Sequence, residues 1–165
     1  MEPPYAARVQ NAPLPYPDAD LREHPPRPAR EMLGGIVFLP RTIDKTRAKL
    51  QGTLGPYKVT PGISGYLFEW LGITEDAFSA AVRAAASDED VVRWLHAHTD
   101  PATYPGLNEM LVNRRIRDAE HRASVLPAYP ILAGQPDLWN WFEIFDLDDR
   151  WMYQPENRGQ PGAAP

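Results

Sequence analysis

Apolar positions in the middle of the chain recur at alternating spacings of three and four residues, which place side chains on one face of a helix. The clearest stripe consists of Leu39, Ile43, Thr46 and Leu50, which follow one another at spacings of four, three and four. Pro40 falls in the first turn of this helix, where its missing N–H group costs no hydrogen bond. Gly52 then supplies a stop signal. The pattern predicts a helix that begins near Leu39 and ends before Gly52.

Capping residues mark further helices downstream. A short apolar helix over residues 66–71 is ended by Gly72. Thr74 and Ser87 are suited to be N-caps, because each hydroxyl can accept a hydrogen bond from the first turn and acidic residues follow each of them. Behind these two caps lie the apolar stripes Phe78, Ala81, Val82 and Ala85, and Val91, Trp94, Leu95 and His98.

The second half of the chain shows two more helical stripes. Spacings of four, three, four and three predict one helix through Val112, Ile116, Ala119, Ala123 and Leu126. A final helix from about Asp137 brings together Leu138, Trp141, Phe142 and Phe145. Strand propensity is weak, because the one β-branched stretch, at residues 57–60, ends at Pro61. We therefore predict an all-α fold, a single compact helical domain of five or six helices.

The two ends of the chain lack this periodicity. Eight of the 19 prolines lie in the first 28 residues, and proline fixes φ and removes a backbone donor. We predict a Pro-rich extended arm at residues 1–26 that is irregular and contributes little to the main core. The segment 154–165 is rich in Pro, Gly and Ala and is predicted to be a flexible tail. The helical domain is then expected to occupy residues 27–153.

Composition narrows the classes of function. The absence of Cys excludes disulfides, thiolate metal sites and a Cys nucleophile. The net charge of −5 and the lack of a basic-aromatic motif argue against nucleic-acid binding. The N-terminus has no basic or apolar region typical of a signal peptide, and no apolar run approaches the roughly 20 residues of a spanning helix. We expect a cytoplasmic protein that does not engage membranes.

Several blocks of the sequence resemble one known family. Residues 33–48 read LGGIVFLPRTIDKTRA and residues 52–57 read GTLGPY, and the stretches 68–73 (FEWLGI) and 141–149 (WFEIFDLDD) match further along. Together they resemble the bacterial family catalogued as domain of unknown function 5069, over about residues 27–153. The family usually carries Asp where this chain has Glu143. The resemblance implies a small helical domain and supplies no catalytic residues, since none are established for the family.

The charged residues of the first helix form the main candidate site. Arg41, Asp44 and Arg47 recur every three residues beside the apolar stripe, so ion pairs between neighbours three apart are expected. One interpretation is a salt-bridged surface or a bridge to the acidic C-terminal helix. The other is a pocket for an anion or carboxylate, built from Arg41, Lys45 and Arg47 beside Asp44 with Tyr57 as a neighbour, because the arginine fork suits bidentate recognition.

The C-terminal helix supplies candidates for binding a partner. Every charge between residues 137 and 149 is acidic, and Trp139 and Trp141 lie two apart, so one of them is expected to point away from the core. The partner-binding candidates are Trp139, Asp146 and Asp148. We predict no metal site and no cofactor, because the acidic run departs from the EF-hand pattern. The pair Asp118 and His121 also lacks the repeated partners of a di-metal bundle.

Gly34 and Gly35 are explained by a tight turn at positive φ better than by an anion site, because the P-loop signature is missing. No catalytic residue is identified, and the sequence leaves open whether the chain is an enzyme. The leading hypothesis is a non-catalytic binding or interaction module that uses the Arg41–Arg47 cluster toward a small anionic ligand or a protein partner. The alternative is a small enzyme or metabolite-binding protein with the same cluster in a closed pocket.

Overall fold

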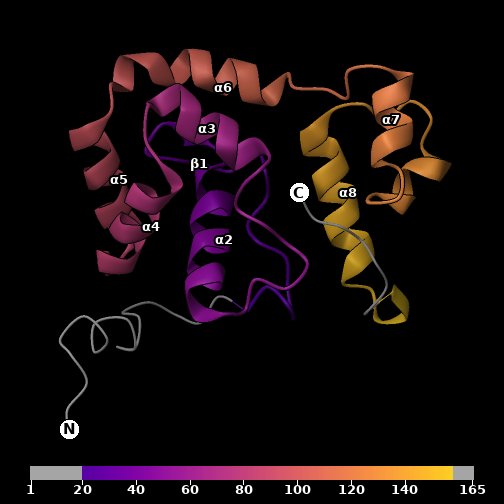
Figure 1. Ribbon diagram of the computed structural model, residues 1–165, viewed down its shortest axis with the longest axis horizontal. Coiled ribbons are helices and arrows are strands. Elements are labelled where there is room, and N and C mark those ends of the chain that lie inside the picture. Colours follow the sequence, from indigo (N-terminus) through magenta and orange to yellow (C-terminus); the bar gives the residue numbers. More distant parts are fainter. Residues whose placement is uncertain (1–19, 158–165) are drawn as a thin grey trace, which may run out of the picture.

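Two strands and seven α-helices are found in the part of the chain that the computed structural model describes, residues 20–157 (Figure 1). The predicted all-α class is confirmed, with a small hairpin added. The strands are β1 (Met32–Leu33) and β2 (Ile36–Val37), and the α-helices are α2 (Leu39–Gln51), α3 (Ile63–Leu71), α4 (Glu75–Ala84), α5 (Asp88–His98), α6 (Tyr104–Val112), α7 (Ala119–Val125) and α8 (Trp141–Met152). Three short 3-10 helices lie at Pro101–Thr103, Pro130–Gly134 and Pro155–Asn157.

Helix α2 occupies the centre of the fold and has the bounds that its sequence predicts. Pro40 lies in its first turn, and Gly52 ends it in the left-handed conformation at φ 75°. Most of its side chains are buried, polar ones included. Phe38, the residue before the helix, has a φ of 67°, which is unusual for a bulky residue. Stacking of its ring on Phe142 of α8, with centroids 5.4 Å apart, accompanies this conformation.

The Gly34-Gly35 pair forms the turn of the β1–β2 hairpin. Both glycines have positive φ, 58° and 86°, as a two-residue hairpin turn requires, and Met32 pairs with Val37. The predicted tight turn is therefore confirmed. The amide of Asn108 in α6 donates to the Gly35 carbonyl and accepts from the Val37 N–H, so the hairpin is tied to that helix.

The caps predicted for the middle helices are also confirmed. Thr74 accepts a hydrogen bond from the Ala77 N–H at the start of α4. Ser87 and Asp90 form a reciprocal capping box at the start of α5. Gly72 ends α3 at φ 67°. Local chemistry therefore fixed these helix boundaries.

The predicted continuous helix through residues 112–126 is wrong. Helix α6 ends at Val112, and α7 begins only after Asp118, whose side chain caps it by accepting from the His121 N–H. Between them Arg115 pairs with Asn140 in an isolated bridge, and the buried Ile116 donates its N–H to the Trp139 carbonyl. These bonds to residues 139 and 140 replace the backbone hydrogen bonds of the continuous helix that the apolar stripe predicted.

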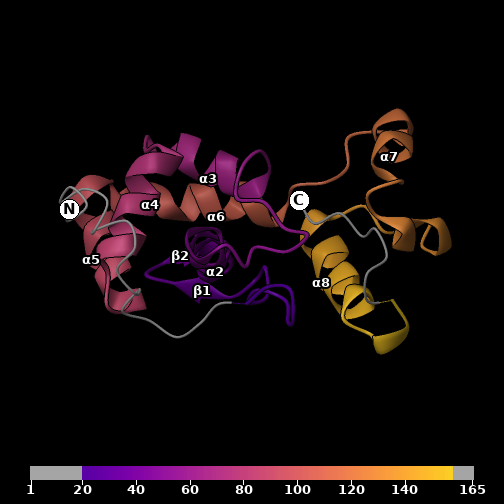
Figure 2. The same ribbon diagram turned by 60° about the horizontal axis from the view of Figure 1, so that its bottom comes forward.

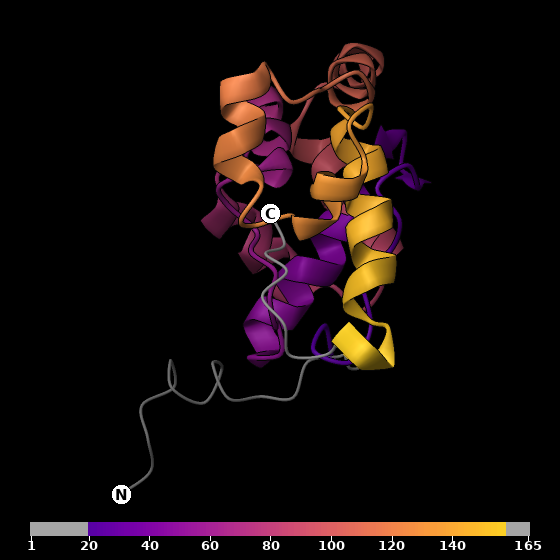
Figure 3. The same ribbon diagram turned by 90° about the vertical axis from the view of Figure 1, so that its right-hand side faces the viewer.

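Helix α8 lies beside α2, as their opposite charges and apolar stripes predict (Figure 3). Asn140 caps α8 by accepting from the Phe142 and Glu143 N–H groups, so the helix begins a few residues later than expected. Figures 1 and 2 show α7 and α8 at one end of the long axis and α4 and α5 at the other, with the segment after α6 joining the two ends.

The predicted arm and tail lie mostly outside the described residues: 1–19 and 158–165 are not described, so those predictions are untested there. The last part of the arm contains Leu21, which is fully buried in a small apolar cluster with Ala48, Tyr57 and Met152. The described start of the tail includes Asn157, whose amide donates to the Trp151 carbonyl. None of the helices between residues 20 and 157 has the length and apolar character needed to cross a membrane.

Candidate functional site

Arg41, the first residue of the predicted cluster, lies in the interior. Its side chain is 1% exposed and its guanidinium donates to both carboxylate oxygens of Asp149, at 2.7 and 3.1 Å. The Tyr57 hydroxyl donates to the same carboxylate at 2.7 Å. The guanidinium carbon also lies 5.5 Å from the ring centroids of Tyr57 and Phe145. These contacts join α2 to α8 and leave Arg41 enclosed by protein.

The expected ion pairs between Arg41, Asp44 and Arg47 are replaced by bonds to other elements. Asp44 accepts from Arg27, both from its backbone N–H at 2.8 Å and from its guanidinium. Arg27 also pairs with Asp88 at the start of α5, at 2.6 Å, and Arg47 pairs with the same Asp88 at 2.8 Å. No sequence pattern singled out Arg27, which precedes the helix and links it to α5.

Lys45 is the least compensated charge-bearing residue of the cluster. Its side chain is 1% exposed, and among residues 20–157 its amine forms no hydrogen bond and no ion pair. The amine lies 5.2 Å from the Phe38 ring centroid. Burial, and then the positive charge of Arg41, hold the pKa of Lys45 well below its usual value. An interior amine of this kind costs stability in its charged form.

The acidic residues of α8 divide between interior and surface. Asp148 is 1% exposed, and its Oδ1 has no hydrogen-bond partner among the described residues. Burial, and then the neighbouring Asp149 charge, raise the pKa of Asp148 to about 7. Burial raises the pKa of the half-buried Asp146 as well. Trp139 is half-buried, with its indole N–H donating to the Pro136 carbonyl.

The raised pKa of Asp148 predicts how its substitution changes pH dependence. From the unfolded value of 3.8 up to about 7, the folded protein holds a proton at Asp148 that the unfolded chain releases, so this residue's contribution to stability declines as pH rises. In Asp148→Asn this contribution is absent. We expect the free energy of unfolding of the variant, relative to wild type, to increase between pH 4 and pH 7. Urea titrations at several pH values measure it, and a constant difference would contradict the assignment.

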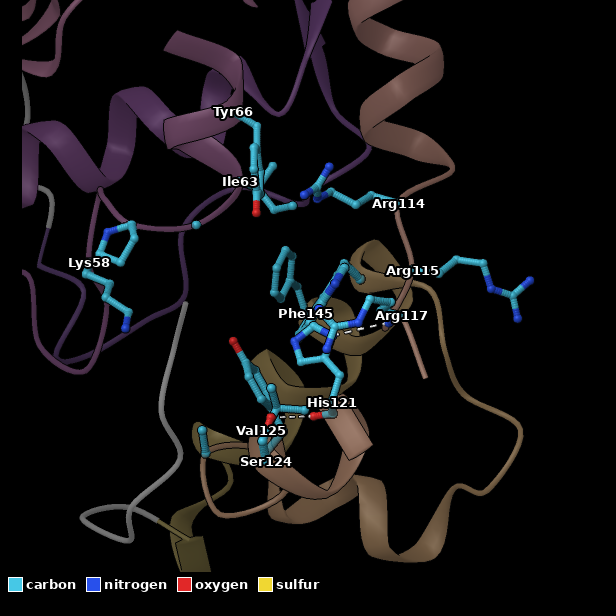
Figure 4. A pocket seen from close by; sticks show the side chains of 15 residues that line it. Lys58, Ile63, Tyr66, Arg114, Arg115, Arg117, His121, Ser124, Val125 and Phe145 are labelled. Atoms are coloured by element: carbon cyan, nitrogen blue, oxygen red, sulfur yellow. Dashed lines mark hydrogen bonds between the residues drawn. The ribbon is translucent and has the colours of Figure 1, made fainter. Parts of the chain in front are cut away.

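A cleft lies apart from the predicted cluster, between the start of α3 and the segment from α6 to α8 (Figure 4). Its volume is about 680 Å³, within the range of small-molecule sites. Among residues 20–157, its ionisable lining contains three arginines, a lysine, a histidine and two tyrosines, and no carboxylate. The lining residues are Lys58, Pro61, Gly62, Ile63, Tyr66, Arg114, Arg115, Arg117, His121, Ser124, Val125, Ala128, Tyr129, Trp141 and Phe145.

Arg114 is the best-positioned cation of this cleft. Its guanidinium carbon lies 3.4 Å from the ring centroid of Tyr66, and one nitrogen contacts the Met110 sulfur at 3.8 Å. No carboxylate of residues 20–157 forms an ion pair with it. Figure 4 shows Arg114 directed toward Tyr66, whereas Arg115 extends away from the other labelled side chains. Stacking on Tyr66 therefore fixes the orientation of the Arg114 guanidinium, while its N–H donors have no carboxylate partner among the described residues.

His121 adds a side-chain donor. Its Nδ1 accepts from the Arg117 backbone N–H at 3.2 Å, which in the neutral ring puts the proton on Nε2. In Figure 4 the ring reaches toward Phe145. The suggested pairing of Asp118 with His121 is a helix cap, and the described residues contain no group of three or more His, Asp or Glu side chains that suits a metal ion. Gly62 and Ile63 also bring the uncapped amino end of α3 to the cleft.

Sequence reasoning missed this site because its residues come from three separate segments. The one available indication was the run Arg114-Arg115-Ile116-Arg117, which the apolar stripe through Ile116 assigned to the outer face of a helix. Arg41, Asp44, Lys45, Arg47 and Tyr57 do not line this cleft.

Two comparisons with known proteins bear on identity. The family model described as "Domain of unknown function (DUF5069)" matches residues 23–151, most of the chain and all of the α-helices named above except the last residue of α8. No curated protein matches the sequence.

Proposed function

The chain belongs to the DUF5069 family, a domain of unknown function, and from this premise we propose that it is a non-catalytic binding domain for a small anionic molecule. The proposed site is the cleft between α3 and the α6–α8 segment. The buried Arg41–Asp149 ion pair joins α8, which borders the cleft, to α2, and the ligand contacts are assigned to Arg114 and His121.

The position of Arg114 carries this proposal. An arginine without a carboxylate partner is ordinarily extended into water, but Arg114 is half-buried and stacked on Tyr66. Its planar fork keeps several N–H donors available, which matches the oxygens of a phosphate or carboxylate group. No acidic side chain is among the described lining residues. Asp118 pairs with Arg117 of the lining at 2.7 Å, which leaves Arg114 available to an incoming anion. The effective dielectric constant in a cleft is lower than in bulk water, so the attraction between the guanidinium and an anion is stronger there.

The hydroxyl groups of the cleft favour binding over catalysis. Ser124 donates to the backbone carbonyl of His121 at 2.7 Å and does not contact the imidazole. Burial raises the pKa of Tyr129, so that its hydroxyl stays protonated. Nucleophilic catalysis needs a hydroxyl hydrogen-bonded to its base, and the described lining lacks such a pair.

Neighbouring arginines provide a matched test of the proposal. We expect Arg114→Gln to weaken binding of inorganic pyrophosphate at least about tenfold, since charge-assisted hydrogen bonds are lost. Arg115→Gln removes the same charge one residue away. Arg115 also borders the cleft, but its side chain extends away from the other labelled side chains, so the variant is expected to change the affinity less than about threefold. NMR titration of the isotopically labelled proteins gives the dissociation constants. Equal losses of affinity in both variants would show that only the net charge matters. That result would contradict the assignment of the anion contact to Arg114.

A further inference from the structure

We propose that the ligand of the cleft is an aromatic anion, a planar ring that carries a phosphate or a carboxylate. This inference rests on the anion-binding function proposed above. It adds the aromatic ring of the ligand, which the cations of the cleft do not account for. It follows from an aromatic wall that lies in the same cleft as Arg114.

Three rings form this wall. Trp141 is half-buried, and its ring centroid lies 5.7 Å from that of Phe145 and 5.6 Å from that of Tyr129, with the Tyr129 ring edge-on. Phe145 and Tyr129 are buried and hold the indole in place, and the His121 ring centroid lies 6.0 Å from that of Trp141. Trp141 therefore presents a rigid aromatic surface to the cleft, and a ligand ring placed against it would remove apolar area of both partners from water.

The indole N–H of Trp141 supports the same assignment. In Trp70 and Trp139 the corresponding group donates to a backbone carbonyl, of Thr103 and Pro136 respectively. Within residues 20–157 the indole of Trp141 makes no hydrogen bond. A half-buried donor beside a cationic cleft is suited to an acceptor on the ligand. Tyr66, on the other side of the cleft, has one face covered by Arg114. The ligand ring is therefore assigned to Trp141 and its anionic group to Arg114, at adjoining positions of the cleft.

Matched pairs of small probes separate the ring from the charge. Dissociation constants are measured by NMR titration for phenyl phosphate against methyl phosphate, and for benzoate against acetate. We expect the aromatic member to bind at least about tenfold more tightly in at least one pair. Comparison of phenyl phosphate with benzoate, which share the ring and differ in the acid group, identifies the oxyanion. In Trp141→Leu the ratio is expected to fall toward one while the methyl probe keeps its affinity. Trp141→Phe, which retains a ring, is expected to keep most of the ratio.

Trp70→Leu is the control, because Trp70 is half-exposed on α3 and does not line the cleft. It should leave both affinities unchanged. Equal dissociation constants for aromatic and methyl probes in the wild-type protein would overturn the aromatic assignment and leave the anion site standing. Failure of all four probes to bind the wild-type protein would overturn the proposed function itself. If Trp141→Leu does not fold, the wild-type ratios and Trp141→Phe still decide the matter.

Discussion

Asp149→Ala is expected to lower the free energy of unfolding by about 3–5 kcal/mol, the largest loss among the substitutions considered. The Asp149 carboxylate accepts two hydrogen bonds from Arg41 and one from Tyr57, and all three side chains are buried. Without it the interior holds an unpaired guanidinium between α2 and α8. Urea denaturation near pH 7 measures the change.

Glu143→Ala is the control for this prediction. Glu143 lies on the same helix but is exposed, and its nearest cation, Arg30, is 3.8 Å away. An exposed ion pair of this kind contributes less than about 1 kcal/mol. A double variant, Arg41→Met with Asp149→Leu, should recover most of the lost stability because neither member of this pair is left as an unpaired charge. Similar small losses for Asp149→Ala and Glu143→Ala would show that the network is not enclosed as described.

Lys45→Met is expected to stabilise the protein by about 1–4 kcal/mol near pH 7, the range found when well-packed apolar side chains replace buried charged groups. Methionine keeps the unbranched shape of the lysine stem and its contact with the Phe38 ring. The lowered pKa of Lys45 sets the pH dependence. Below its unfolded value of 10.5 the unfolded chain binds a proton that the folded protein binds less readily, so wild-type stability rises as pH approaches 10.

The advantage of Lys45→Met over wild type should therefore shrink between pH 7 and pH 10. Lys49→Met, one turn further along α2, is the control, because Lys49 is exposed and paired with Glu75 at 2.6 Å. It should change stability by less than about 1 kcal/mol with no such trend. Thermal or urea unfolding at several pH values provides the comparison. A destabilised Lys45→Met would indicate that the amine has a stabilising role in the interior.

The elements predicted correctly are those whose boundaries depend on nearby residues. Thr74, Ser87 and Gly72 cap or end their helices through backbone positions within a few residues, so the sequence contains the relevant chemistry. The helix expected through residues 112–126 failed for the opposite reason. Ile116 is buried, and its N–H donates to the Trp139 carbonyl, which lies outside the segment. A buried residue of a loop is as apolar as a buried residue of a helix, so the apolar stripe could not distinguish the two.

The candidate site was less predictable than the fold. The sequence indicated correctly that Arg41, Asp44 and Arg47 beside the apolar stripe of α2 form ion pairs, and it anticipated the bridge between α2 and the acidic C-terminal helix. It did not indicate which partners would be chosen: Arg27 for Asp44, and Asp88 for Arg47. The Arg114–Tyr66 stack joins a residue of α3 to one in the connection between α6 and α7, and no local pattern specifies it.

Chemical-shift mapping with pyrophosphate tests the central claim most directly, because it locates the anion without any substitution. We predict saturable shifts of the backbone amides that border the cleft, Gly62, Arg114 and His121 among them, with little change across residues 41–49 of α2. Saturable shifts centred on residues 41–49, or no saturable shift at the cleft, would contradict the account.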